Sequence, residues 1–293
     1  KKTRWWLCVR SDFKNFTGRK RKRKTLPFFS CHDVKTFFQA YTSNIGASGE
    51  DMFETTLSID IGRKNYLDYV YNRLKPHIRL TDSVVTSSVN TDRCFLSLAC
   101  EDEYREALHG EIVESLCDVY AMGFKYDYLK KKLKINRENL LIKTLLNTMT
   151  VFDSNNDKRA IRKELYGQPI IAIDGFFDFR LRAVREKWDE IINLTNENAI
   201  VFSDDKISGE FLMFLLDALP QSLDGVKICA NGDRAELFDK KGRKIKMIKP
   251  VGRSKTEEET ILFNLICLAP KKVLIADEKR FSDEFMSIVR QFF

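Results

Sequence analysis

The sharpest chemical feature of the sequence is an unbroken run of six cations, which has aromatic residues such as Trp5 and Phe28 on both sides. Such a run can neutralise several phosphates, and the aromatic rings can stack on bases. A run of this kind is also typical of a solvated tail. The candidate nucleic-acid contacts are therefore Arg19, Lys20, Arg21, Lys22, Arg23 and Lys24.

Acidic residues form the second group that could do chemistry. Asp204-Asp205 and Glu257-Glu258-Glu259 each precede an expected helix, where acids complement the helix dipole. Asp277, after an aliphatic run, is the one acid that suggests a metal-dependent nuclease. The histidines fall in no metal or hydrolase motif, and no glycine-rich phosphate loop occurs. We therefore predict no catalytic residue, no metal site and no cofactor, and a nuclease-like phosphodiesterase ranks third among the functions.

The net charge of +8 over 293 residues is confined to the start of the chain. Residues 1–51 contain 12 Lys/Arg and 4 Asp/Glu, so residues 52–293 are balanced. We expect residues 1–51 to be a disordered basic extension. The alternative is that the natural start is Met52, the first Met of the sequence, and that residues 1–51 lie upstream of it.

The cysteines and the hydropathy pattern bear on the compartment. The 7 Cys are an odd number with wide spacings and no CxxC pair, which favours reduced, buried thiols. No apolar run approaches the roughly 18–20 residues of a membrane helix. We predict a cytoplasmic protein that does not enter a membrane.

Residues 52–124 have the pattern β-α-β-β-α. Residues 53–61 alternate between apolar and polar side chains, which predicts a strand. A helix over 65–75, ended by Pro76, is followed by a hairpin of 84–89 and 94–100. A long amphipathic helix then begins near Tyr104 and ends near Gly123.

The rest of the chain divides into a helical middle, residues 125–222, and an α/β part, residues 223–293. One apolar stripe from Phe177 to Ile191 predicts a single helix. Residues 226–248 predict a three-stranded meander. A helix that begins with a capping box at Ser254, a buried strand over 272–276 and a last helix follow it. The predicted fold class is therefore α/β (α+β mixed).

Three motifs of the C-terminal half, IDGFFDFRL at residues 173–181, AELFDKKG at 235–242 and APKK at 269–272, together resemble the sporulation protein YtxC family. Residues 173–181, IDGFFDFRL, are similar to its GF-x-x-FRL signature, and the APKK turn of residues 269–272 is similar to its ending. The hairpin motif of residues 235–242 also fits the family pattern. The resemblance spans residues 52–293 and leaves residues 1–51 without a counterpart.

The resemblance implies a cytoplasmic protein of endospore-forming bacteria with no established activity, cofactor or catalytic residue. Its pattern positions here are Gly175, Phe176, Phe179, Arg180 and Leu181. We expect Gly175 to permit a sharp turn into the helix, and Phe179 and Leu181 to pack. Arg180 either pairs with an acid in the core, which we favour, or contacts a ligand. The expected function is non-enzymatic contact with an unknown protein partner, and the alternative is nucleic-acid binding through the basic arm.

Overall fold

The computed structural model describes residues 52–81, 83–135, 137–168, 170–196, 201–232, 234–252 and 255–293. They form two compact units, and both the helices and the sheets confirm the predicted mixed α/β class. The first unit combines residues 52–117 with Arg162–Leu181, and the second combines Asp118–Ile161 with Arg182–Phe293. Each unit is therefore built from two separate stretches of the chain, whereas the predicted parts 52–124, 125–222 and 223–293 are consecutive.

The first unit contains a four-stranded sheet in the order β2-β3-β1-β4. The alternating segment forms β1 (Met52–Asp60), whose residues Thr55, Leu57 and Ile59 are buried as the period of two predicts. The predicted hairpin is also confirmed, as β2 (Val84–Val89) and β3 (Arg93–Glu101). Strand β3 runs antiparallel to β1, and β4 (Ile170–Ala172) runs parallel to its other edge.

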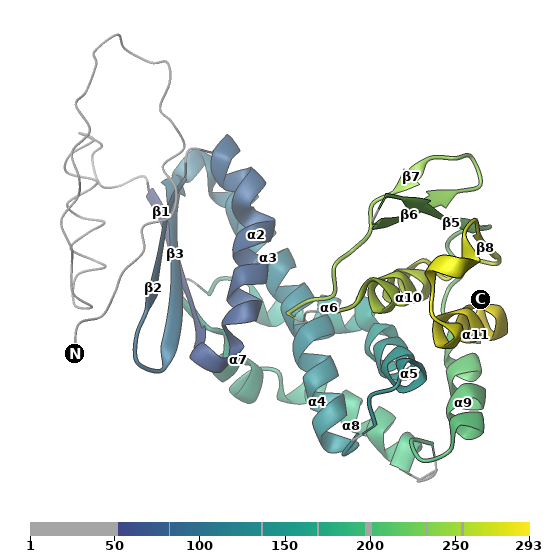
Figure 1. The fold of residues 1–293 in the computed structure, drawn as a ribbon. Coiled ribbons are helices and arrows are strands. Elements are labelled where there is room, and N and C mark those ends of the chain that lie inside the picture. Colours follow the sequence, from purple (N-terminus) through teal and green to yellow (C-terminus); the bar gives the residue numbers. More distant parts are fainter. Residues whose placement is uncertain are drawn as a thin grey trace. The chain divides into compact units, whose positions relative to one another are not determined.

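Helices α2 (Lys64–Leu80) and α3 (Arg105–Asp118) lie on one face of this sheet (Figure 1). Short 3-10 turns, η1 (Ile61–Arg63) and η2 (Asp102–Tyr104), precede them. The prediction that Pro76 ends α2 is wrong, because Pro76 lies inside the helix. The buried side chains of Val70 and Leu74 hold the helix on the sheet, and this packing outweighs the backbone hydrogen bond that proline removes.

The second unit begins where α3 ends. The predicted end of a helix near Gly123 is wrong: residues Val119–Phe124 form a π-helical turn, η3, that leads directly into α4 (Lys125–Lys132). All six residues of η3 are buried. Their burial explains the continuation, because packing compensates for the low helix propensity of glycine.

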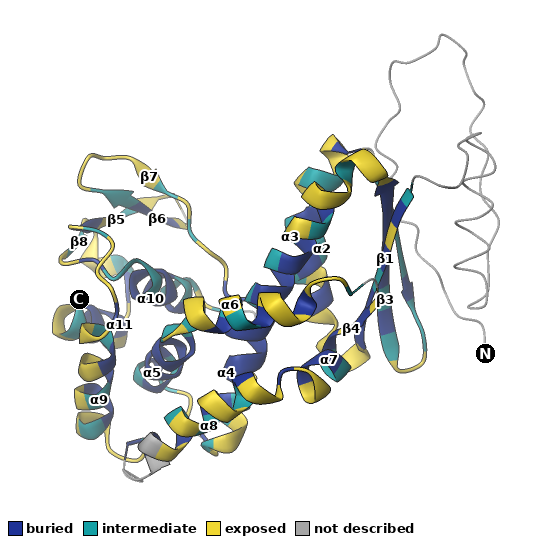
Figure 2. Ribbon diagram, turned by 180° about the vertical axis from the view of Figure 1, so that it is seen from behind, coloured by how far each residue is buried: buried dark blue, intermediate teal, exposed yellow. Residues whose placement is uncertain are grey.

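The other helices are α5 (Leu140–Val151), α6 (Ser154–Leu165), α7 (Ile173–Phe179), α8 (Arg182–Asn196), α9 (Asp205–Asp217), α10 (Glu257–Leu268) and α11 (Asp283–Phe292). The predicted single helix along the Phe177–Ile191 stripe is wrong, since α7 ends at Phe179 and α8 begins at Arg182. In the second unit, α5 and α10 are mostly buried (Figure 2). The capping box of α10 uses Thr256 and Glu259 rather than Ser254.

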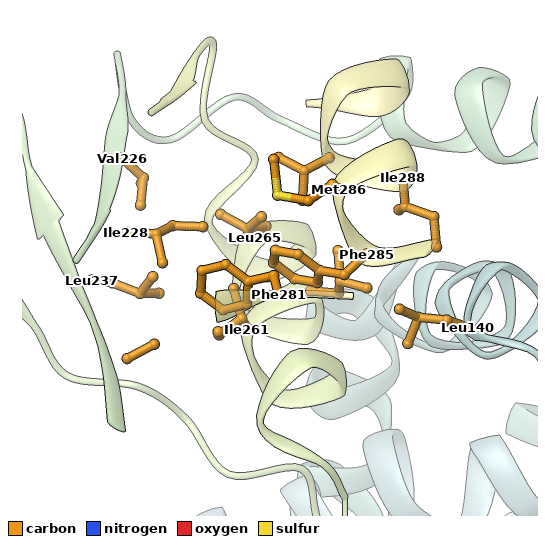
Figure 3. Packing of buried hydrophobic residues seen from close by; sticks show 13 residues of the cluster. Leu140, Val226, Ile228, Leu237, Ile261, Leu265, Phe281, Phe285, Met286 and Ile288 are labelled. Carbon is orange, nitrogen blue, oxygen red and sulfur yellow. The ribbon is translucent and has the colours of Figure 1, made fainter. Parts of the chain in front are cut away.

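The second sheet has the order β7-β6-β5-β8. The predicted meander is confirmed as β5 (Val226–Asn231), β6 (Arg234–Asp239) and β7 (Lys244–Ile245). The prediction of a buried last strand is wrong: β8 (Val273–Ile275) pairs with β5 at the sheet edge, and Leu274 is 67% exposed. Ile228 and Leu237 point towards α10 and α11, where they meet Phe281 and Phe285 (Figure 3).

Candidate functional site

The segment that carries the family pattern follows β4 directly. Strand β4 lies along β1, so the start of α7 comes next to the carboxyl end of β1 and the first residue of β3. Asp174, in the first turn of α7, meets Arg93 there in a two-pronged ion pair. Arg93 Nη2 lies 2.7 Å from Asp174 Oδ1, and Nη1 lies 3.1 Å from Oδ2. The pair fastens α7 to the sheet.

The carboxylate of Asp174 accepts further hydrogen bonds from the backbone. The amides of Asp60 and Gly175 donate to it over 3.2 and 3.0 Å, and Arg93 also donates to the Ser58 hydroxyl. Burial opposes the charge of Asp174, but these hydrogen bonds and the guanidinium outweigh it and lower the pKa of Asp174. The hydrogen bond to Asp174 likewise raises the pKa of Arg93. Both members of the pair are therefore ionised at neutral pH.

Two pattern residues anchor the segment from within. Phe176 and Leu181 are buried, and the prediction that Leu181 packs is confirmed. The expectation for Gly175 is wrong: its φ is not positive, and an added Cβ would meet the Ala172 side chain at an ordinary 3.6 Å. The turn into α7 therefore does not require glycine.

The other two pattern residues point to solvent. Phe179 is 84% exposed, so the prediction that it packs is wrong. Arg180 is also exposed, which contradicts the favoured ion pair in the core. Neither residue belongs to the apolar stripe, which passes from Phe177 to Leu181, and the side chains of those two residues are buried. The segment is held in place by its buried side chains and by the Arg93–Asp174 pair, and it exposes the Phe179 ring and the Arg180 guanidinium to solvent.

The three successive glutamates of α10 have structural partners within the second unit. Glu257 accepts hydrogen bonds from the Ala235 amide and from Arg280. Glu258 accepts from the amide and the hydroxyl of Ser282, the N-cap of α11, and Glu259 completes the capping box and pairs with Lys143. These acids tie α10 to its neighbours and do not converge on one point.

The remaining candidate acids are also separate. Asp204 caps α9, and Asp205 pairs with Arg137. Asp277 is exposed at the start of the 3-10 turn η4 (Glu278–Arg280), and its side chain does not cap that turn. Within the described ranges, no group of three or more His, Cys, Asp or Glu could hold a metal ion. The predicted contacts Arg19, Lys20, Arg21, Lys22, Arg23 and Lys24 lie outside the described residues.

The sequence analysis missed a buried ion pair in the second unit. Lys125 is fully buried, and its Nζ lies 2.7 Å from Asp157 Oδ2 and 2.7 Å from the carbonyl oxygen of Phe152. The ammonium also lies 5.8 Å from the ring centroid of Trp188. Burial lowers the pKa of Lys125, and the charge of Asp157 opposes this shift. Only the position of Lys125 directly after a buried apolar run could have suggested that it is buried.

The cysteines Cys94, Cys100, Cys117, Cys229 and Cys267 are free thiols. Burial raises the pKa of Cys100 to about 11 and that of Cys267 to about 12. In the described part of the chain, no helix has the length and apolar character needed to cross a membrane.

Comparisons with protein-family models, with curated protein sequences and with solved structures find no match.

Proposed function

We propose that this chain is a cytoplasmic, sporulation-associated protein of the YtxC type, which acts by holding a partner protein and not by catalysis. The observation that carries the proposal is the exposure of Phe179 and Arg180 on an anchored segment. Aromatic residues and arginine dominate the binding energy of protein interfaces.

The anchoring makes this exposure useful. The Arg93–Asp174 pair and the buried side chain of Phe176 fix the start and the middle of α7. A binding segment whose backbone is already rigid loses less conformational entropy on binding than a mobile loop does. Tyr166 and Ile170, from the same stretch of chain, are also exposed large side chains. Their exposure supports a contact surface on this part of the first unit.

The cytoplasmic assignment rests on the thiols. Free, buried cysteines such as Cys94 and Cys117 are typical of proteins kept in a reducing compartment.

The partner contact is tested by photo-crosslinking in the native host. A benzoylphenylalanine replaces Phe179 in the full chain, and a second variant carries it at Leu80, which is 80% exposed in the same unit. We expect a discrete crosslinked protein from position 179 that is absent from position 80. Identical crosslinks from both positions, or none from position 179, would refute the contact.

The biological role is tested by counting heat-resistant spores. Deletion of the gene should lower the count, and the full-length wild-type chain should restore it. The Phe179→Ala/Arg180→Ala variant should not restore it, whereas the control Leu80→Ala should. A deletion strain that forms spores at the wild-type frequency would overturn the sporulation role.

A further inference from the structure

The balanced charge of residues 52–293 conceals a strongly basic region in the second sheet. From Lys240 to Lys255 there are eight Lys/Arg and no Asp/Glu. Taken together, residues 224–249 and 270–276 contain ten Lys/Arg and four Asp/Glu, a net charge of +6. The rest of residues 52–293 must therefore carry −6, so the fold separates charges that cancel in the total.

The strand register places these cations on one face. Lys244 lies opposite Phe238, and Phe238 lies opposite Lys227, so these three residues form a row across β7, β6 and β5. Lys227 is in register with Leu274 of β8, which extends the row to the sheet edge. The side chains of Ile228 and Leu237 point into the core (Figure 3). Because strand side chains alternate, the row formed by their neighbours lies on the opposite face of the sheet.

A second row of this face adds two more lysines. Val226 pairs with Asp239 of β6 and with Val273 of β8. The same register continued by one residue places Gly225 between Lys240 and Lys272. Gly225 has no side chain, and this leaves room for the side chain of Lys240. A Cβ added at Gly225 would lie only 3.3 Å from the Cε of Lys240. The hairpin between β6 and β7 is exposed (Figure 2).

Acidic neighbours neutralise only part of this charge. Glu236 pairs with Lys244, and Asp224 lies between Lys240 and Lys271. Among the described residues, Lys227, Lys246, Lys249 and Lys272 have no ion-pair partner and are exposed. The face therefore retains unpaired positive charge at Lys227 and Lys272, next to the half-buried ring of Phe238.

We infer that this face, formed by Lys227, Phe238, Lys240, Lys244, Lys272 and Leu274 and called here the basic sheet face, binds single-stranded nucleic acid. Neighbouring strands lie about 4.8 Å apart, so the cations flank the Phe238 ring within reach of the phosphates next to a stacked base. A single strand fits better than a duplex, because only unpaired bases can stack on a side chain of a flat sheet. The inference is independent of the proposed protein contact on the first unit and of the basic run at residues 19–24.

The experiment uses the full chain with Arg19, Lys20, Arg21, Lys22, Arg23 and Lys24 changed to Gln, so that the basic run contributes little. Fluorescence anisotropy measures its binding to labelled (dT)15 between 50 and 200 mM NaCl. We expect binding that weakens with salt. Phe238→Leu should weaken it about 5- to 150-fold, and Phe238→Tyr should retain it, because base stacking is worth about 1–3 kcal/mol.

Two charge variants separate this face from the rest of the surface. Lys227→Gln/Lys272→Gln, which removes the two unpaired lysines of the face, should make the slope of log K against log salt shallower by about 1.4, because each phosphate contact contributes about 0.7 for a single strand. The control Lys187→Gln/Lys206→Gln removes two exposed cations from α8 and α9 and should leave the slope unchanged. Circular dichroism melts check that all variants fold.

The inference is overturned if the chain with the changed basic run does not bind (dT)15, if Phe238→Leu binds as well as Phe238→Tyr, or if both lysine pairs change the slope equally. Vesicles of phosphatidylcholine and phosphatidylserine, and polyglutamate, are tested in parallel. Binding to either of these without binding to (dT)15 would also overturn it.

Discussion

We expect the Arg93–Asp174 ion pair to be the main polar interaction that holds α7 against the first sheet. It makes two charge-assisted hydrogen bonds, and its side chains are 31% and 17% exposed. Such bonds contribute about 1.5–3 kcal/mol each when shielded from water. Partial exposure reduces this value, so we expect a coupling energy of about 1–2 kcal/mol in the first unit.

A double-mutant cycle measures this coupling. Arg93→Met, Asp174→Ala and the double variant are compared with wild type by hydrogen exchange of the slowest amides of β1 and β3, which reports the free energy of opening. The control cycle uses Lys64 and Asp68, an i,i+4 pair of the same unit at 3.6 Å whose side chains are 54% and 55% exposed. That pair should contribute only about 0.3–0.5 kcal/mol.

The pH dependence follows from the lowered pKa of Asp174. A carboxyl whose pKa is lower in the folded state stabilises the fold above its unfolded pKa, about 3.9, and this contribution is lost as the pH falls through the folded value. The difference in the free energy of opening between wild type and Asp174→Ala should therefore decrease only below about pH 4. A coupling energy no larger than that of the control pair at pH 7, or an advantage that disappears already at pH 6, would refute the reasoning.

Three further predictions concern burial. Lys125→Met should destabilise the second unit by about 3–5 kcal/mol in urea unfolding, because Asp157 stays buried without its partner, and adding Asp157→Leu should recover most of this loss. Leu181→Ala should cost about 2–5 kcal/mol, whereas Phe179→Ala should change stability by less than about 0.5 kcal/mol; equal melting curves would contradict the difference in burial. In the native protein at pH 8, iodoacetamide should alkylate Cys267 far more slowly than a free thiol, because its pKa of about 12 leaves almost no thiolate; alkylation at the free-thiol rate in peptide mapping would exclude this environment.

Local patterns predicted the elements whose signals lie within a few residues. The alternation in β1 and the turn between β2 and β3 were sufficient for the first hairpin and its buried face. The same local logic failed at Pro76 and Gly123, where packing keeps the helix intact. It failed again between Phe179 and Arg182, because an apolar period that continues across a break does not reveal that the helix is interrupted.

The sequence by itself determined the mixed α/β class, the main strands and helices, and the candidate segment at residues 173–181. Only the tertiary structure placed the short strand β4 beside β1, and with it Asp174 beside Arg93, 81 residues earlier in the chain. Only the register of the second sheet gathered Lys227, Lys244 and Phe238 on one face. The physical reason is the same in both cases: local patterns and charge totals are properties of the chain, whereas ion pairs and surface charge depend on distances that long-range pairing sets.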